Sequence, residues 1–120
     1  MGTNKRLGDE AEREACEILH ENGWWCHRMA ATESGQPCDI VAMRRGENML
    51  IDSKNCEKPY LRTSRIEPNQ AACFEFASKL GIKCGFMCRH LGSFFWIGWE
   101  SVDMGAPHQE FSSGIEEVIR

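Results

Sequence analysis

The chain has 120 residues, 42% of them hydrophobic and 27% charged, and its formal net charge at pH 7 is −4. This length accommodates one domain with a sizeable core but not two. No apolar run approaches the roughly 20 residues that a membrane span requires, and residues 1–10 lack the apolar core of a signal peptide. We therefore expect a single domain over residues 1–120 that stays in the cytoplasm.

The seven cysteines are numerous for this length, but their spacing argues against a metal site or a disulfide framework. Zinc and cluster sites favour CxxC pairs, and the nearest approach to one is the wider spacing in residues 84–88. The four histidines show no metal-ligand spacing. Since most of the cysteines fall in apolar segments, we expect buried, reduced thiols. The cysteines in apolar segments are Cys16, Cys26, Cys73, Cys84 and Cys88.

The net negative charge is unusual for a protein that binds nucleic acid, because phosphate binders usually carry a basic excess. Acidic side chains that ligate a metal ion are an exception, since the bound cation makes the surface around them effectively positive. The charge therefore lowers the expectation of a nucleic-acid partner without excluding it.

Residues 7–22 have the periodicity of an amphipathic helix that ends at Gly23. Glu12 falls about 20° from Leu19 around the helix axis, at the border of the apolar stripe. On periodicity alone, Glu12 is interpreted as a surface glutamate. The stripe consists of Leu7, Ala11, Ala15, Ile18 and Leu19.

Residues 24–29 (WWCHRM) predict a short strand, and residues 30–37 (AATESGQP) a loop of small, polar and turn-forming residues. This loop leads directly to Asp39. A loop just before a candidate site is where a segment that contacts substrate would lie, although a plain connection is the alternative.

Residues 38–54 (CDIVAMRRGENMLIDSK) predict a β-hairpin and hold the strongest functional signal. Two apolar, β-prone runs flank the turn residues RGEN. Strand side chains alternate between faces, so Asp52 and Lys54 share a face. A hairpin closed around Gly46 sets Asp39 opposite Asp52, or diagonal to it, on that face. Two acids and a lysine there are costly unless a cation or a substrate phosphate compensates for them.

Residues 55–67 (NCEKPYLRTSRIE) predict a loop in which Lys58, Arg62 and Arg65 surround Tyr60. Basic residues interleaved with an aromatic beside a possible active site suggest phosphate contacts. A solvated loop is equally compatible with this segment.

A second helix is predicted from Pro68 to about Leu80, because proline favours a first helical turn. Its expected buried stripe consists of Cys73, Phe76, Ala77 and Leu80. Gln70 shares that face. It is either a core or capping hydrogen-bonder, or a polar group directed into the site.

Two further strands are predicted at residues 82–88 and 94–99, with a turn at 90–92, and a last helix at 114–119. The aromatic run Phe94-Phe95-Trp96 has side chains for both sheet faces, hence for a core and for an interface. The order α-β-β-β-α-β-β predicts an α/β fold with a mixed sheet of about five strands flanked by helices.

Several motifs, in this order, resemble the PD-(D/E)xK nuclease superfamily, and within it the archaeal-type Holliday-junction resolvases. Residues 8–13 (GDEAER) match G-x-x-x-E-R, and Gly23, Trp24 and Arg28 match a strand that ends in arginine. A loop containing Ser and Gly leads to P-x-D at residues 37–39. The signature (D/E)-x-K follows at residues 52–54, with Asp52 where the family often has glutamate. D-x-K alone is a weak motif, but the ordered combination is fairly specific, and the likeness covers nearly the whole chain.

The resemblance implies a restriction-endonuclease-like fold and a metal-dependent, structure-selective DNA endonuclease, with a Holliday-junction resolvase as the leading reading. It implies that Glu12, Asp39 and Asp52 ligate one or two Mg²⁺ or Mn²⁺ ions and that Lys54 is the fourth catalytic residue. Because a resolvase makes two symmetric cuts in branched DNA, a homodimer is also implied. The expected phosphate contacts are Arg28, Arg13, Arg62 and Arg65, and the expected supporting residues are Gln70 and Ser34.

Three other interpretations stay open. Another small nuclease of the superfamily, of phage or repair type, would cut flaps, nicks or duplex DNA. A binding module would keep the fold without catalysis, although a degenerate copy would usually have lost one of the four catalytic residues. A metal-binding or redox protein built on the cysteines is disfavoured, because CxxC is absent.

Overall fold

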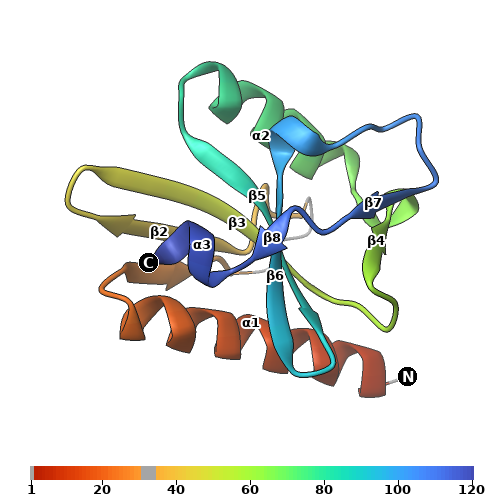
Figure 1. Ribbon diagram of the computed structural model, residues 1–120, viewed down its shortest axis with the longest axis horizontal. Helices are drawn as coiled ribbons and strands as arrows, with labels where there is room; N and C mark the ends of the chain where they lie inside the picture. Colours follow the sequence, from red (N-terminus) through yellow and green to blue (C-terminus); the bar gives the residue numbers. More distant parts are fainter. Residues whose placement is uncertain (1, 31–34) are drawn as a thin grey trace.

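The computed structural model describes residues 2–30 and 35–120. A long first helix lies along one side of a twisted sheet, and a second helix lies on the other side (Figure 1). In chain order the elements are α1 (Gly2–Glu21), β1 (Trp25–Arg28), β2 (Ile40–Arg44), β3 (Glu47–Asn55), β4 (Tyr60–Arg62), the 3₁₀ helix η1 (Thr63–Arg65), α2 (Pro68–Lys79), β5 (Lys83–His90), β6 (Ser93–Gly98), the 3₁₀ helix η2 (Trp99–Ser101), β7 (His108–Glu110), β8 (Ser113–Gly114) and α3 (Glu116–Ile119).

The main sheet has six strands in the order β1-β2-β3-β5-β6-β8. β3 and β5 pair in parallel, with α2 in the connection between them, and the other neighbouring strands pair antiparallel. This is the predicted mixed sheet flanked by helices. It has six strands instead of about five because the two-residue β8 pairs with β6 at the far edge.

Alternate residues of the central strands enter two separate cores. α1 and the sheet face that it covers form one core, which includes Ala15, Leu19, Ile40 and Ile51. α2 and the opposite face form the other, which includes Phe74, Phe86 and Ile97. Since Ile51 points toward α1, the next residue, Asp52, points toward α2.

The predicted hairpin is present, and its turn is tighter than the sequence suggests. Arg45 and Gly46 alone connect β2 to β3, and Gly46 has a φ of +77°, a conformation that glycine adopts readily. Glu47 and Asn48, which we expect in the turn, already belong to β3, where Glu47 pairs with Arg44. The short turn fixes the register that brings the two acids together.

The predicted stripe of α2 is wrong in part. Phe76 and Leu80 are 68% and 63% exposed, whereas the buried residues of this helix are Gln70, Phe74 and Ala77. Both sets fit a helical period, so spacing alone does not choose between them. The choice follows from packing, because the ring of Phe74 meets that of Phe86 edge to face at 5.4 Å.

The segment of residues 55–67 is more regular than the predicted loop. β4 pairs with β7 in a separate two-stranded sheet, and β7 lies between residues 99 and 114, where the sequence predicts no strand. Three-residue strands carry too few alternating positions to be recognised by pattern. The last helix begins at Glu116, later than predicted, because residues 113–114 form β8.

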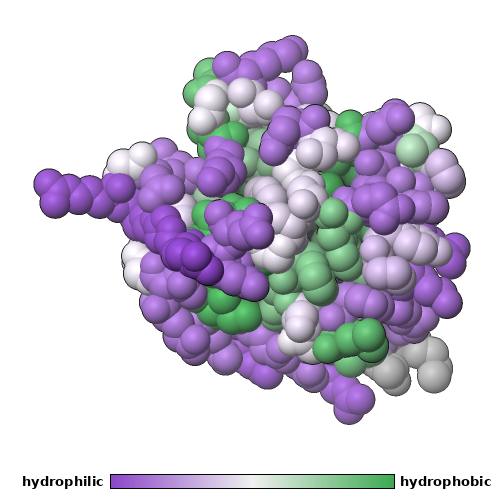
Figure 2. Space-filling model, viewed as in Figure 1, coloured by the Kyte–Doolittle hydropathy of each residue, from purple (hydrophilic) through white to green (hydrophobic). Residues whose placement is uncertain are grey.

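The aromatic run of β6 lies largely in the core. Phe94 and Trp96 are buried, and Phe95 is covered in part by Phe111, whose ring stacks on it at 4.7 Å. Figure 2 shows hydrophobic atoms over β6 among mostly hydrophilic surroundings. The interface predicted from these three residues therefore has little free surface.

All seven cysteines are free thiols, and five of them are buried. Cys26 and Cys73, which we expect to be buried, are partly exposed, so the prediction is wrong for these two. Within residues 2–30 and 35–120, no helix is long and apolar enough to cross a membrane.

Arg89 on β5 fastens α1 to the sheet. Its Nη1 lies 3.0 Å from Glu10 Oε1 and 2.7 Å from Glu14 Oε2, and its Nε donates a hydrogen bond to Asn55 Oδ1 at 2.9 Å. The side chain is buried, so these charge-assisted bonds are poorly screened by water. These bonds fix the position of α1, the helix that carries Glu12, relative to the sheet.

Replacement of Arg89 by methionine should lower the free energy of unfolding by about 1–3 kcal/mol, because Asn55 loses its partner and α1 its anchor. Urea denaturation measures this loss. The matched control is Lys79→Met, since Lys79 makes a 3.9 Å ion pair with Glu75 on the exposed surface. That change should cost less than about 0.5 kcal/mol. Equal losses in the two variants would contradict the anchoring role.

Candidate active site

The site is centred on Asp52, a carboxylate that β3 holds in the interior. Asp52 is 1% exposed. Lys54, two residues along the same strand and therefore on the same face, places its Nζ 2.9 Å from Asp52 Oδ2. The same ammonium group donates to the backbone carbonyl of Arg65 at 3.0 Å. Lys54 is thus held between the buried acid and the start of the α2 connection.

Gln70 holds the other oxygen of Asp52. Its Nε2 donates to Asp52 Oδ1 at 2.9 Å, while its Oε1 accepts the backbone N–H of Glu67 at 3.1 Å. The second bond belongs to a capping box at the start of α2. Gln70 therefore does both things that its sequence position suggests, since it caps the helix and points its amide into the site.

The negative charge of the buried Asp52 carboxylate is only partly compensated by neighbouring positive charge and hydrogen bonds. Burial raises its pKa to about 7, and Lys54 offsets only part of that effect, while Asp39 adds to it. Although Lys54 is close to Oδ2, it lies off the hydrogen-bonding direction, and Oδ2 accepts no hydrogen bond from any residue in the described ranges. A buried oxygen with a free lone pair is costly, and an added cation would relieve that cost.

Asp39 lies opposite Asp52 at the open end of the hairpin. The register pairs Ile40 with Ile51, so the next position places the two acids side by side. Asp39 Oδ2 accepts the backbone N–H of Ser53 at 2.8 Å, and Oδ1 accepts Gln36 Nε2 at 3.2 Å. These bonds fix the carboxylate against the start of the D-x-K segment.

Glu12 reaches the same end of the sheet from α1. Its Oε1 accepts a hydrogen bond from Arg28 Nε at 3.1 Å, and only 16% of its side chain is exposed. Burial raises the pKa of Glu12, and the nearby charge of Asp39 raises it further, against the lowering effect of Arg28. The periodicity-based interpretation of Glu12 as a surface glutamate is therefore wrong.

The three acids do not form a closed cage. Within the described residues, no set of three His, Cys, Asp or Glu side chains stands ready to hold a metal ion. The chemistry of the donors nevertheless fits a hard cation, because the group is all oxygen and one buried oxygen has a free lone pair. The Lys54 ammonium group lies where part of that positive charge is required.

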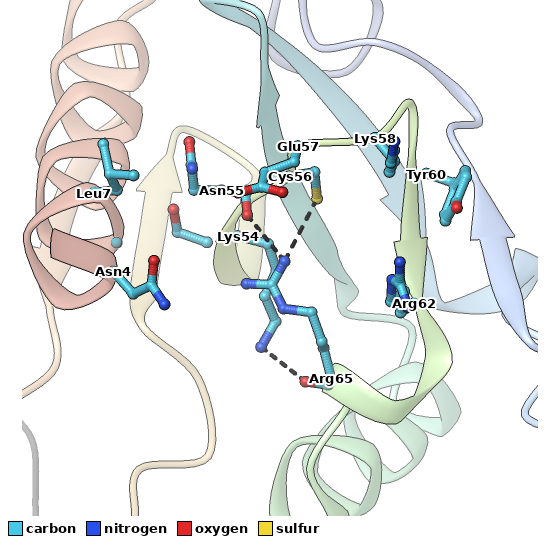
Figure 3. A pocket seen from close by; sticks show the side chains of 12 residues that line it. Asn4, Leu7, Lys54, Asn55, Cys56, Glu57, Lys58, Tyr60, Arg62 and Arg65 are labelled. Carbon is cyan, nitrogen blue, oxygen red and sulfur yellow. Dashed lines mark hydrogen bonds between the residues drawn. The ribbon is translucent and has the colours of Figure 1, made fainter. Parts of the chain in front are cut away.

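A cleft of about 490 Å³ runs from Lys54 between α1 and β4. Asn4 and Leu7 line it on the helix side, and Tyr60 and Arg62 on the strand side (Figure 3). Arg65 lies across its middle, where Nη1 donates to the carbonyl of Asn55 at 2.9 Å (Figure 3).

Of the remaining predicted residues, one lies at this cleft, one on the solvent face and one outside the described residues. Arg62 is exposed at the cleft. Arg13 faces solvent, where its Nε lies 3.6 Å from Glu17 Oε1 in an exposed ion pair. Ser34 lies outside the described residues.

Pattern analysis missed the polar partners that position the acids. Gln36 donates a hydrogen bond to Asp39, and Arg89 pairs with the glutamates of α1. Single polar residues such as these carry no periodic signal in the sequence. It also missed Cys56, which lines the cleft and whose thiol pKa is lowered to about 7, chiefly by a hydrogen bond from Cys88 and also by Arg65. Arg89 and Cys56 are recognised only once β3 and β5 are paired, and Gln36 only once the hairpin has placed Asp39.

The model of the archaeal Holliday junction resolvase (hjc) family matches residues 3–96. The chain belongs to this family. The solved structure of Archaeoglobus fulgidus Hjc, described as a Holliday junction resolvase from an archaeal hyperthermophile, is similar with a TM-score of 0.74 at 19% identity. The similarity covers 94% of this chain and 100% of that one, and it shows that the fold is shared. No curated protein matches the chain.

Family membership confirms the predicted nuclease class and the restriction-endonuclease-like fold. The family match ends at Trp96, so β7, β8 and α3 lie outside it. The three acids and Lys54 lie inside it, with Asp39, Asp52 and Lys54 at the end of the hairpin and Glu12 on α1.

The raised pKa of Asp52 predicts how the stability of the metal-free protein depends on pH. Between about pH 4 and pH 7, the folded chain keeps a proton that the unfolded chain loses. The contribution of Asp52 to stability is therefore present below pH 4 and is lost as the pH rises through 7. Relative to Asp52→Asn, the wild type should lose on the order of 1–4 kcal/mol across this window.

Urea unfolding of both proteins in EDTA at several pH values measures the difference. Above about pH 8 the two stability curves should run parallel, because Asp52 is then ionised in both the folded and the unfolded state. A constant difference from pH 4 to pH 8 would show that the carboxyl titrates normally.

Proposed function

We propose that the chain is a Mg²⁺- or Mn²⁺-dependent endonuclease that cuts branched DNA, with the four-way junction as its preferred substrate. The observation that carries this proposal is the juxtaposition of Asp39, Asp52 and Lys54 at one end of the β2–β3 hairpin. Asp52 Oδ2 is buried 2.9 Å from the Lys54 ammonium but accepts no well-aligned hydrogen bond from the described residues, a state that a divalent cation would relieve. Membership of the resolvase family supports the choice of substrate.

Asp39 and Asp52 would hold the cation, with Glu12 as the third ligand. When bound, a hard divalent cation polarises the phosphate and lowers the pKa of a water molecule. Gln70 and the Ser53 N–H keep the two aspartates in place, so that they need not reorganise when the cation arrives. Ser34 is the proposed further support, from the loop before Asp39.

Lys54 would act on the reacting phosphate. Its ammonium group is held by Asp52 and by the Arg65 carbonyl, so it is a point charge in a fixed place. From there it orients the attacking water or stabilises the pentavalent phosphorus as negative charge develops.

Arginines around the site would grip the DNA backbone. Arg28 is close to the scissile position because it already contacts Glu12, and its side chain is 43% exposed. Arg62 and Arg65 line the cleft beyond Lys54, where they suit neighbouring phosphates. Arg13 is the weaker contact, since it lies on the solvent face of α1 beside Glu17.

A two-fold homodimer is part of the proposal, because symmetric cuts across a junction require two active sites. α2 offers the surface for it. Phe76 and Leu80 lie four residues apart on this helix and are both largely exposed, which is unusual for large apolar side chains on one helix face.

Asp39→Asn and Lys54→Ala should each reduce Mg²⁺-dependent cleavage of a four-way junction by at least about 100-fold, because each change removes charge at the reacting centre. A gel assay of cleaved strands measures this. Lys79→Gln, an exposed surface change remote from the hairpin, is the matched control and should leave the rate unchanged. Full activity in either site variant, with an unaltered far-ultraviolet spectrum as the check on folding, would reject the assignment.

Glu12→Gln tests the third ligand separately. Calorimetric titration with Mg²⁺ should show weaker binding, because an amide replaces a carboxylate ligand. An isotherm identical to that of the wild type would remove Glu12 from the metal site.

Phe76→Glu combined with Leu80→Glu should convert a dimer to a monomer in light scattering at micromolar concentration, because two charges would be buried across the two-fold axis. The change should leave the monomer folded, since both side chains already face solvent. Wild type that is monomeric at that concentration would contradict the dimer, and with it paired cutting of a junction, but not nuclease chemistry.

A further inference from the structure

The cleft beside Lys54 has the size of a single nucleotide and not of a duplex. Its volume of about 490 Å³ lies within the range of roughly 300–1,000 Å³ that holds small molecules. The floor is the end of β3, and the walls are the first turns of α1 and the strand β4 (Figure 3). We therefore expect a nucleic-acid strand that follows this cleft from Lys54 to enter it without its complement.

Tyr60, the single tyrosine of the chain, forms part of the cleft wall. Its ring stacks on that of His108 from β7, with centroids 4.2 Å apart and planes 28° apart. His108 Nε2 lies within hydrogen-bond distance of Glu110 Oε1, at 3.1 Å, which restrains the second ring. The pair is a ready aromatic platform at the side of a hydrophilic cleft.

The ribbon of β4 and β7 that carries this platform is firmly held. Leu61, between Tyr60 and Arg62, is fully buried on the opposite face of β4. Gln109 on β7 is also buried, and its Nε2 donates to Thr63 Oγ1 at 2.8 Å and to the Asp103 carbonyl at 2.7 Å. A platform fixed in this way loses little conformational entropy when a base stacks on it.

The charge of the cleft is opposite to that of the chain. Among the described residues, its lining has one acid, Glu57, and four basic residues. The basic residues are Lys54, Lys58, Arg62 and Arg65. A basic groove with an aromatic side chain is the combination by which proteins bind single strands without reading sequence.

Stacked duplex bases present no free face to a tyrosine, whereas nucleotides at a branch point can leave the stack. We propose that the cleft binds one unpaired nucleotide next to the scissile phosphate, with its base stacked on Tyr60 and its backbone beside Arg62 and Lys58. This inference rests on the proposed nuclease function and names the feature that the site selects. Selectivity for branched DNA then comes from the access of an unstacked base to the cleft. The β7 half of the platform lies outside the family match, which ends at residue 96.

Binding of three probes tests the proposal in EDTA, so that cleavage plays no part. The probes are an oligonucleotide of five thymidines, a four-way junction and a linear duplex. Each probe carries a fluorophore, and its binding is measured by fluorescence anisotropy. Tyr60→Leu should weaken binding of the oligonucleotide and the junction about tenfold, as expected for the loss of one base–aromatic stack, and leave duplex binding unchanged. Tyr60→Phe, which keeps the ring, should stay within about twofold of the wild type on all three.

A photochemical measurement needs no substitution and so does not depend on whether Tyr60→Leu folds. A junction with 5-iodouracil at the branch point is irradiated with the wild-type protein, and the crosslinked peptide is identified by mass spectrometry. The crosslink should map to Tyr60. Crosslinks only at other residues, or equal weakening of duplex and junction binding in Tyr60→Leu, would overturn the proposal. Failure of the wild type to cleave any junction with Mg²⁺ would instead reject the nuclease function and leave these binding results interpretable.

Discussion

The buried carboxyl group of Asp52 is the constraint on which the rest of the site depends. A charge in the interior is stable only if its surroundings compensate for it, and Lys54 and Gln70 do so incompletely. The resulting pKa near 7 leaves this carboxyl with a proton that a divalent cation can displace. A site that is unfavourable when empty is suited to binding a cation.

Both helices serve this arrangement from opposite faces of the sheet. α2 supplies Gln70, whose amide caps its own helix with one atom and holds Asp52 with the other. α1 supplies Glu12, and the buried Arg89 fixes that helix to β5. Hydrogen bonds and ion pairs of the surrounding residues therefore hold Asp52 and the helix that carries Glu12 in place, although the acids do not form a closed cage.

The sequence predicts the part of the site that depends on strand alternation. Asp52 and Lys54 must share a face of β3, and a short turn at Gly46 must bring Asp39 opposite. Glu12 is not predicted in this way, because the helical period places it at the border of the apolar stripe of α1. Only the ordered family motifs indicate that it belongs to the site. The stripe of α2 is wrong in part because two sets of residues fit the same period, and the packing of Phe74 on Phe86 decides between them. Sequence patterns do not predict the wall of the cleft, because Tyr60 and His108 lie 48 positions apart and meet only when two three-residue strands pair.

The net charge of −4 is compatible with a nucleic-acid substrate, because the described lining of the cleft is basic although the chain as a whole is acidic. The titration of Asp52 itself tests this account most directly. The ¹³C carboxyl resonance of Asp52, assigned by its loss in Asp52→Asn, is followed against pH with and without Mg²⁺. The account predicts a midpoint near 7 in the free protein and a fall of at least about one unit when Mg²⁺ is added. A midpoint near the ordinary value of about 4, or one that Mg²⁺ does not move, would contradict it.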